Sequence, residues 1–127
     1  MGKKPILIVG GEPNSIFLEI FFKSIKANSY KSPLIIVVSK KLLQEQMIKL
    51  GFSFKINDID IKFKNFSKLD NKKINLINVD YNFKKCFEKI SNKSNKYINE
   101  TFLIALKLMQ QNKFSKFING PISKKYF

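Results

Sequence analysis

Two short motifs at opposite ends of the sequence combine glycine turns with side chains that could contact a ligand. The first, residues 10–15 (Gly-Gly-Glu-Pro-Asn-Ser), follows the apolar run at residues 6–9. The second, residues 119–124 (Asn-Gly-Pro-Ile-Ser-Lys), follows another apolar run that ends at Ile118. Ligands of parallel α/β sheets bind at the carboxyl ends of the strands, so both turns lie where chemistry is expected.

The chemistry open to these turns is the binding of an anion. Free N–H groups at a helix start after the first turn could face a negative ligand, and the ammonium of Lys124 could pair with a phosphate or carboxylate. Neither turn has the Gly-Lys-Ser/Thr or Gly-x-Gly-x-x-Gly pattern of a nucleotide-binding loop. The alternative is ordinary turn chemistry, in which Pro13 or Ser15 starts a helix and Gly120-Pro121 closes a strand.

The composition excludes several other kinds of site. The sequence has no histidine, which removes the commonest general base and metal ligand. Its single cysteine, Cys86, excludes an internal disulfide and makes the cytoplasm the default compartment. No window approaches the ~18 consecutive apolar residues of a membrane span. We therefore expect a cytoplasmic protein with no metal site of its own and no membrane partner.

The net charge of +15 is a weak argument for nucleic-acid binding. All 24 basic residues are lysines, whereas arginine is the residue that reads guanine and grips phosphate with two parallel hydrogen bonds. The lysines are spread along the chain, and Lys, Asn and Ile share A/T-rich codons, so biased base composition explains the charge better. A basic module that binds anions or nucleic acid remains an alternative function.

The hydrophobic pattern predicts the elements that position the two turns. Continuous apolar runs predict buried strands, and apolar residues at helical spacing predict helices between them. A length of 127 residues allows one domain with a core. We predict a single α/β unit over residues 1–127, a mostly parallel sheet flanked by helices. The predicted strands are Ile6–Val9, Leu34–Val38, Ile74–Val79 and Phe114–Ile118, and the predicted helices are Ser15–Lys26, a helix capped by Ser39 and closed by Gly51, and Tyr97–Gln111.

The remaining segments carry weaker patterns. Alternating apolar residues predict two strands with one wet face, at Phe52–Ile56 and Ile59–Phe63. Residues 81–96 are rich in Lys, Asn and Ser without a clear period, which predicts a loop with a helical turn at Lys85–Ile90. The helix at Ser15–Lys26 is apolar except for one narrow stripe, so we expect it to be buried on most sides. The chain is too short to supply all of that cover, and we expect the isolated chain to show an apolar patch and to self-associate.

Together, the two turns resemble motifs of the 4-hydroxythreonine-4-phosphate dehydrogenases. Gly11-Glu12-Pro13 after the first strand, with Glu19 further on, is similar to the family's opening Gly-Asp/Glu-Pro-x-Gly-Ile-Gly-Pro-Glu. The segment at residues 120–124 resembles the family's Pro-Ile-x-Lys segment, which also follows a long helix and a strand. The chain departs from the pattern at residues 15–18, where Ser-Ile-Phe-Leu stands in place of Gly-Ile-Gly-Pro.

The resemblance covers all 127 residues but only the first portion of the family members, which are more than twice as long. It implies a partial isocitrate/isopropylmalate dehydrogenase-like architecture and the N-terminal part of a longer two-domain enzyme. The implied activity is the NAD-dependent oxidation and decarboxylation of a phosphorylated hydroxy amino acid in pyridoxal phosphate biosynthesis. The implied partners are NAD, a divalent metal acting as a Lewis acid, and a second copy in a homodimer.

The same resemblance makes Glu12, Asn14 and Lys124 candidate cleft residues. Glu12 could orient a cation or a hydroxyl, and Lys124 could offset substrate or cofactor charge. The alternative is that all three are helix-start and turn residues. The family's metal-binding histidines lie beyond the segment that this chain matches. A further alternative is therefore a non-catalytic partner of a second chain that carries them.

The purified 127-residue chain should bind a catalytic metal weakly and turn over no substrate, because it has no histidine and no clustered carboxylates. The test mixes the chain with 4-hydroxythreonine 4-phosphate, NAD and a divalent cation, and follows the absorbance of NADH. Measurable NAD reduction would refute this expectation.

Overall fold

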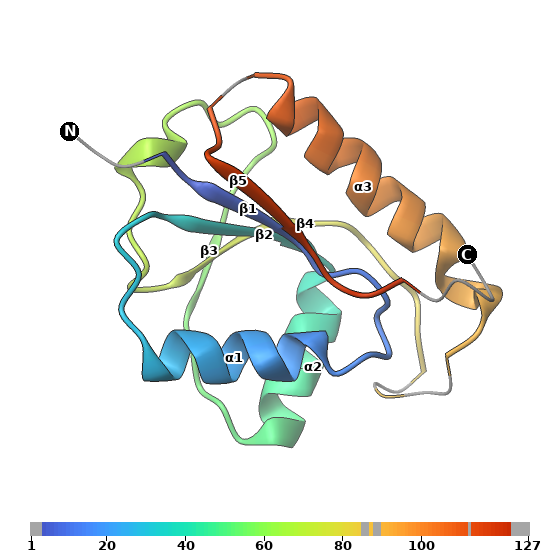
Figure 1. Ribbon diagram of the computed structural model, residues 1–127. Helices are drawn as coiled ribbons and strands as arrows, with labels where there is room; N and C mark the ends of the chain where they lie inside the picture. Colours follow the sequence, from blue (N-terminus) through green and yellow to red (C-terminus); the bar gives the residue numbers. More distant parts are fainter. Residues whose placement is uncertain (1–3, 85–86, 88–89, 112, 123–127) are drawn as a thin grey trace.

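Five parallel strands form one sheet at the centre of the protein, in the order β3-β4-β2-β1-β5. The computed structural model describes residues 4–84, 87, 90–111 and 113–122. Figure 1 shows the sheet between two layers of helices. The elements in chain order are β1 (Ile6–Val9), α1 (Phe17–Ala27), β2 (Leu34–Val38), α2 (Lys40–Leu50), β3 (Ile56–Asp58), a 3-10 turn (Phe66–Lys68), β4 (Ile74–Asn78), a second 3-10 turn (Asn92–Ser94), α3 (Asn95–Met109) and β5 (Lys116–Asn119).

The predicted parallel sheet is confirmed, including the pairing of its first and last strands. β5 lies beside β1 in parallel register, with Leu7 opposite Phe117. Alternate residues of β1 point to opposite faces: Leu7 and Val9 pack on the α3 side, and Ile8 packs on the side of α1 and α2. Both faces are covered, which explains why these strands read as continuous apolar runs rather than as alternating ones.

The ends of α2 follow the sequence signals. The Ser39 side chain accepts a hydrogen bond from the backbone N–H of Leu42, as an N-cap residue does. Gly51 follows the last turn with a φ of 79°, a left-handed conformation that suits glycine. By contrast, α1 begins at Phe17, two residues after the predicted start, because Ser15 is held in a turn by two hydrogen bonds to the carbonyl of Glu12.

The two strands predicted in the middle of the chain are wrong in extent. Only β3, at Ile56–Asp58, pairs with the sheet. Phe52 and Phe54 instead stack on each other, with ring centroids 5.8 Å apart, and both contact the Phe22 ring of α1. An apolar side chain can be buried against a helix without a strand ladder, and the period-2 pattern does not separate these cases. The helical turn predicted at Lys85–Ile90 lies largely outside the described residues.

Part of the apolar surface of α1 is exposed, in agreement with the expectation that this chain cannot cover all of the helix. Leu18, Phe21 and Phe22 are buried, but Ile16 is 65% exposed and Ile20 is 54% exposed. The sheet and α2 cover one side of the helix, and none of the described residues covers the side that carries these two isoleucines. In the part of the chain that the structure describes, no helix is long and apolar enough to cross a membrane.

The two glycine turns pack backbone against backbone. A Cβ atom on Gly120 would lie 2.2 Å from the carbonyl oxygen of Gly10, and one on Gly11 would lie 2.6 Å from the carbonyl carbon of Gly120. Gly11 also has a φ of 71°. Since neither backbone can move away without breaking the β1–β5 pairing, these positions exclude any side chain.

Replacing Gly120→Ala should lower the free energy of unfolding by about 3 kcal/mol, because the added methyl group meets main chain that cannot rotate away. The measurement is urea unfolding followed by circular dichroism. Gly51→Asn is the matched control: nothing lies within 4 Å of a Cβ there, and asparagine tolerates a positive φ, so the loss should stay below ~1 kcal/mol. Equal stability of the two variants would contradict the close contact at Gly120.

Candidate functional site

The fold brings the two glycine turns together at the carboxyl edge of the sheet. The backbone N–H of Gly120 donates to the carbonyl of Val9 at 2.7 Å, and the N–H of Glu12 donates to the carbonyl of Pro121 at 2.8 Å. Residues more than 100 positions apart in the sequence thus form one continuous surface. This is the edge where ligands of parallel α/β sheets bind.

Glu12 is a buried residue of this edge, with 3% of its surface exposed. Its carboxylate accepts a hydrogen bond from the backbone N–H of Asn14 at 3.2 Å and one from the Ser94 hydroxyl at 3.2 Å. Ser94 directly precedes α3, so the carboxylate lies at the positive end of that helix. Glu12 therefore ties the turn after β1 to the start of α3.

The structure brings Glu12 and Asn14 together within the first turn. Asn14 is partly exposed, and its N–H points back to Glu12. Lys124, the third predicted site residue, lies outside the described residues. Sequence reasoning missed Ser94, which lies 82 positions from Glu12 and in a segment without a clear period.

Gln46 of α2 is a second buried polar side chain that supports the first turn. Its amide nitrogen donates to the carbonyl of Pro13 at 2.9 Å. Its amide oxygen is the buried side-chain atom that has no hydrogen-bond partner among the described residues. A hydrogen bond from α2 thus fixes the turn from the side opposite Ser94. A polar residue on the apolar face of a predicted helix is the signal that could have identified Gln46.

Tyr97 ties α3 to the end of β2. The backbone N–H of Ser39 donates to the Tyr97 hydroxyl at 2.8 Å, and the Tyr97 ring lies 4.7 Å from that of Tyr81. Burial raises the pKa of the Tyr97 hydroxyl well above its ordinary value, because the apolar surroundings disfavour the charged form. The hydroxyl is therefore neutral at physiological pH and acts as a positioning group.

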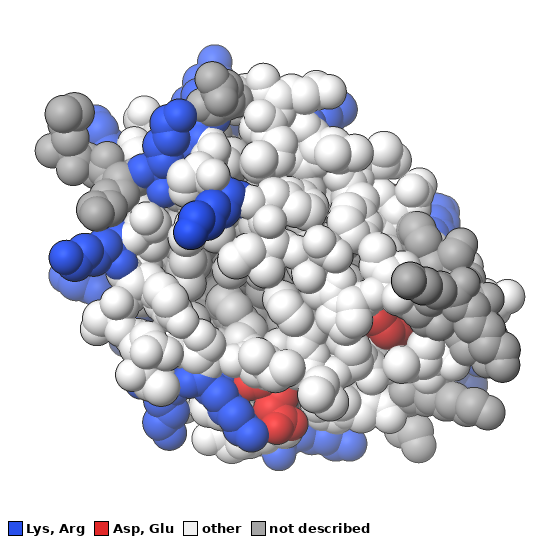
Figure 2. All heavy atoms as spheres, in the orientation of Figure 1, with Lys and Arg blue, Asp and Glu red and all other residues white. Residues whose placement is uncertain are grey.

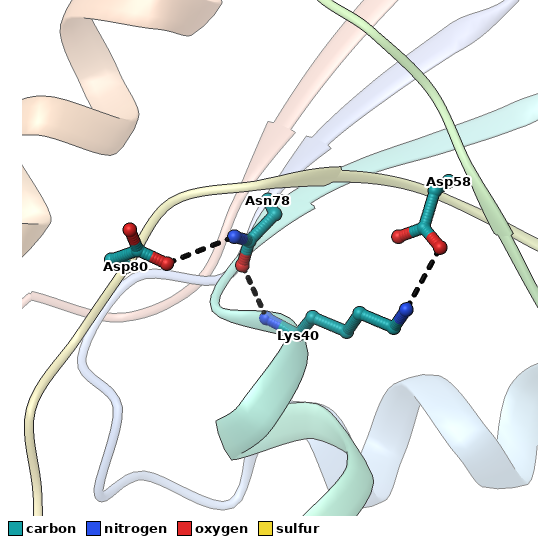
Figure 3. Close-up of polar contacts among 4 residues, drawn as sticks. All are labelled: Lys40, Asp58, Asn78 and Asp80. Carbon is teal, nitrogen blue, oxygen red and sulfur yellow. Dashed lines mark hydrogen bonds and ion pairs between the residues drawn. The ribbon is translucent and has the colours of Figure 1, made fainter.

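A second polar group lies at the ends of β2, β3 and β4 (Figure 3). The ammonium of Lys40 pairs with Asp58 at 2.8 Å, and the backbone N–H of Lys40 donates to Asn78 at 2.8 Å. The amide of Asn78 in turn donates to Asp80 at 3.0 Å. Asp58 is 58% exposed, and exposed ion pairs contribute little stability. These contacts join the start of α2 to the ends of β3 and β4.

The described residues do not include a metal-binding cluster. No group of three or more His, Cys, Asp or Glu side chains that could hold a metal lies in that part of the chain. The residues present at the carboxyl edge therefore do not fit a divalent metal. The first turn is braced by α2 and α3, and the backbone N–H groups of Glu12, Asn14 and Ser15 in it already donate within the protein.

The chain folds as a three-layer parallel α/β domain. Solved structures with the same arrangement of helices and strands are found among dehydrogenases. The chain superposes on a 4-hydroxythreonine-4-phosphate dehydrogenase from Burkholderia phymatum with a TM-score of 0.77 and 18% identity, over 97% of this chain and 38% of that one. It superposes equally well on the enzyme of that name from Klebsiella pneumoniae, with a TM-score of 0.77 and 17% identity over 98% and 39% of the two chains.

The chain thus has the fold of about two fifths of these dehydrogenases, in agreement with the fold that the resemblance implied. The sequence matches no protein-family model, and no curated protein is significantly similar to it. At this identity the superposition establishes the shared fold and nothing about activity.

Ser94→Ala should lower the free energy of unfolding by about 2 kcal/mol, because it removes a hydrogen bond to a buried carboxylate. The matched control is Ser53→Ala, an exposed serine, which should change stability by less than ~0.5 kcal/mol. In a double-mutant cycle with Glu12→Gln, the Ser94→Ala loss should shrink, since the two residues act through one contact. Strictly additive losses would show that the Glu12–Ser94 contact carries no stability.

Proposed function

We propose that this chain forms one wall of the active-site cleft of an NAD-dependent 4-hydroxythreonine-4-phosphate dehydrogenase, or of a relative that acts on a similar phosphorylated hydroxy acid. The observation that carries this proposal is the junction of the two turns. The two motifs that resemble the dehydrogenase family come from opposite ends of the chain, and the Gly120-Pro121 backbone of the second contacts the Gly10–Glu12 backbone of the first at one edge of the sheet. The fold shared with the solved dehydrogenases supports it.

In this proposal some turn residues contact the ligand and another holds the turn in position. Asn14 and Lys124 face the ligand, Lys124 by offsetting the charge of a phosphate or of the cofactor. Glu12 lies at the same edge and keeps the turn in place through Ser94. The backbone N–H groups at the start of α1 favour a negative ligand group, since they carry the positive end of the helix dipole.

The proposal requires polypeptide beyond this chain. The chain spans less than two fifths of the length of the solved dehydrogenases, and its described residues do not fit the divalent metal that the family resemblance implies. The metal ligands, most of the NAD contacts and the second domain then come from the remaining polypeptide. The assembled protein would be a cytoplasmic homodimer.

The test joins this chain to the part of the Klebsiella pneumoniae dehydrogenase that it does not match, and measures NADH formation from 4-hydroxythreonine 4-phosphate. We expect measurable turnover and a fall in kcat/KM of about tenfold for Lys124→Ala, the equivalent of ~1.4 kcal/mol of transition-state binding. Lys113→Ala is the control, a lysine near the opposite end of β5 that should leave kcat/KM unchanged.

Two results would count against the proposal at different levels. An unaltered kcat/KM in Lys124→Ala would remove Lys124 from the site while leaving the function intact. A correctly folded chimaera that oxidises no phosphorylated hydroxy acid with NAD would remove the function itself.

A further inference from the structure

A pocket of about 300 Å³ lies at the amino edge of the sheet, opposite the edge that carries the two glycine turns. It is bounded by the first residues of β2 and β4, Leu34 and Ile74, by the second half of α1 and by the segment that connects α1 to β2. All of its lining residues lie within residues 21–75. The pocket is therefore built without either end of the chain, and it is separate from the site described above.

Apolar side chains form most of the buried lining of this pocket. Phe21 is 8% exposed and Ile74 is 5% exposed, and Ile25 and Leu34 are half-buried. Tyr30 adds a second aromatic side chain to the wall. A volume of about 300 Å³ is at the lower end of the range for small-molecule sites. The lining and the volume together suit a small ligand with a compact apolar body.

Two buried or bridging asparagines hold the walls of the pocket together. The amide nitrogen of Asn71 donates to the carbonyls of Tyr30 at 3.1 Å and Ser32 at 2.9 Å. Its amide oxygen accepts a hydrogen bond from the backbone N–H of Leu34 at 2.9 Å. The amide nitrogen of the buried Asn75 donates to the carbonyl of Leu34 at 3.1 Å. Because these contacts tie the segment before β4 to the segment before β2, the pocket is formed in advance and binding has little ordering to do.

Two lysines stand at the mouth of the pocket, and none of the described residues that line it is acidic. Lys72 and Lys73 are exposed, and neither forms an ion pair with a described residue. The carboxylate nearest in the sequence, Asp70, accepts a hydrogen bond from the backbone N–H of Lys72 at 3.0 Å, and its single charge offsets only part of theirs. Figure 2 shows lysines gathered toward the left of the view, the side on which the strands begin in Figure 1. The amino edge therefore attracts anions.

We propose that this pocket binds a small carboxylate with a compact apolar body, such as an aromatic acid. The carboxylate lies at the mouth beside Lys72 and Lys73, and the apolar body lies against Phe21 and the neighbouring apolar lining. This orientation keeps the negative group away from the last turn of α1, where the helix dipole disfavours an anion. The Ser24 carbonyl in that turn already accepts from the backbone and side chain of Asn28.

A carboxylate suits the pocket better than a phosphate does. Phosphate sites in α/β proteins commonly use free backbone N–H groups. At this edge the N–H of Leu34 donates to Asn71 at 2.9 Å, and the N–H of Ile74 donates to the carbonyl of Lys55 at 2.8 Å. The pocket therefore offers two lysine ammonium groups, each a compact point charge, to a singly charged ligand. This inference does not depend on the proposed enzymatic function.

The experiment is a titration of the 127-residue chain with phenylacetate at neutral pH, followed by backbone amide chemical shifts in NMR spectra. We expect saturable shifts at residues 28–34 and 71–75, with a dissociation constant of about 1 mM or below, which is ordinary for a ligand of this size. Acetate lacks the apolar body and phenylacetamide lacks the charge, so each should bind at least about fivefold more weakly.

The double variant Lys72→Gln/Lys73→Gln should raise the dissociation constant for phenylacetate about fivefold, because it removes both cations at the mouth. The matched control, Lys49→Gln/Lys107→Gln, removes the same charge from two exposed lysines that do not line the pocket, and it should leave the constant unchanged. The same spectra verify that both variants fold.

Four results would overturn the proposal. They are the absence of saturable shifts up to about 20 mM phenylacetate, saturable shifts confined to other residues, equal affinity for acetate or phenylacetamide, and equal effects of the two double variants. The last result would assign the binding to the general attraction of a chain of net charge +15 for anions.

Discussion

The close contact between the Gly10–Gly11 and Gly120–Pro121 backbones is the constraint on which the carboxyl edge of this protein depends. A side chain on Gly120 would overlap the Gly10 carbonyl, and one on Gly11 would overlap the Gly120 backbone, so the pairing of β1 with β5 requires glycine in both of the turns that follow these strands. The same contact holds β5 beside β1, so that β1 is an inner strand between β2 and β5. The first and last strands of the described chain therefore form a single unit, and the two turns share one surface.

Buried polar contacts then hold the helices in register with that edge. Glu12 reaches Ser94 at the start of α3, Tyr97 of α3 accepts from Ser39 at the end of β2, and Gln46 of α2 donates to Pro13. Each contact joins a helix to a turn at the carboxyl edge. Buried polar groups that are satisfied in this way favour one arrangement strongly, because any other leaves a donor or acceptor unpaired in the interior. Rigidity at this edge is what a ligand site built from turns requires.

The net charge of the chain and its exposed apolar side chains have separate implications. A net charge of +15 attracts anions in general, which suits a site for phosphorylated ligands without specifying one. Ile16, which directly precedes α1, and Ile20 within it are exposed. An amphipathic helix that is apolar beyond the width of its buried stripe indicates a contact that this chain alone does not complete.

The sequence by itself determined the strands and helices whose signals are local. Ile6–Val9 and Leu34–Val38 were predicted to the residue because continuous β-branched runs ending at glycine or a capping serine admit few alternatives. α2 followed from Ser39 and Gly51 for the same reason. Only the tertiary structure decided that Phe52 and Phe54 pack on Phe22 rather than in a strand, that Ile20 stays exposed, and that Glu12 bonds to Ser94. These outcomes depend on which surfaces meet across long separations in the chain. The hydrophobic period indicates which face of its own helix or strand a side chain occupies. It does not indicate which residues of other elements pack against that face.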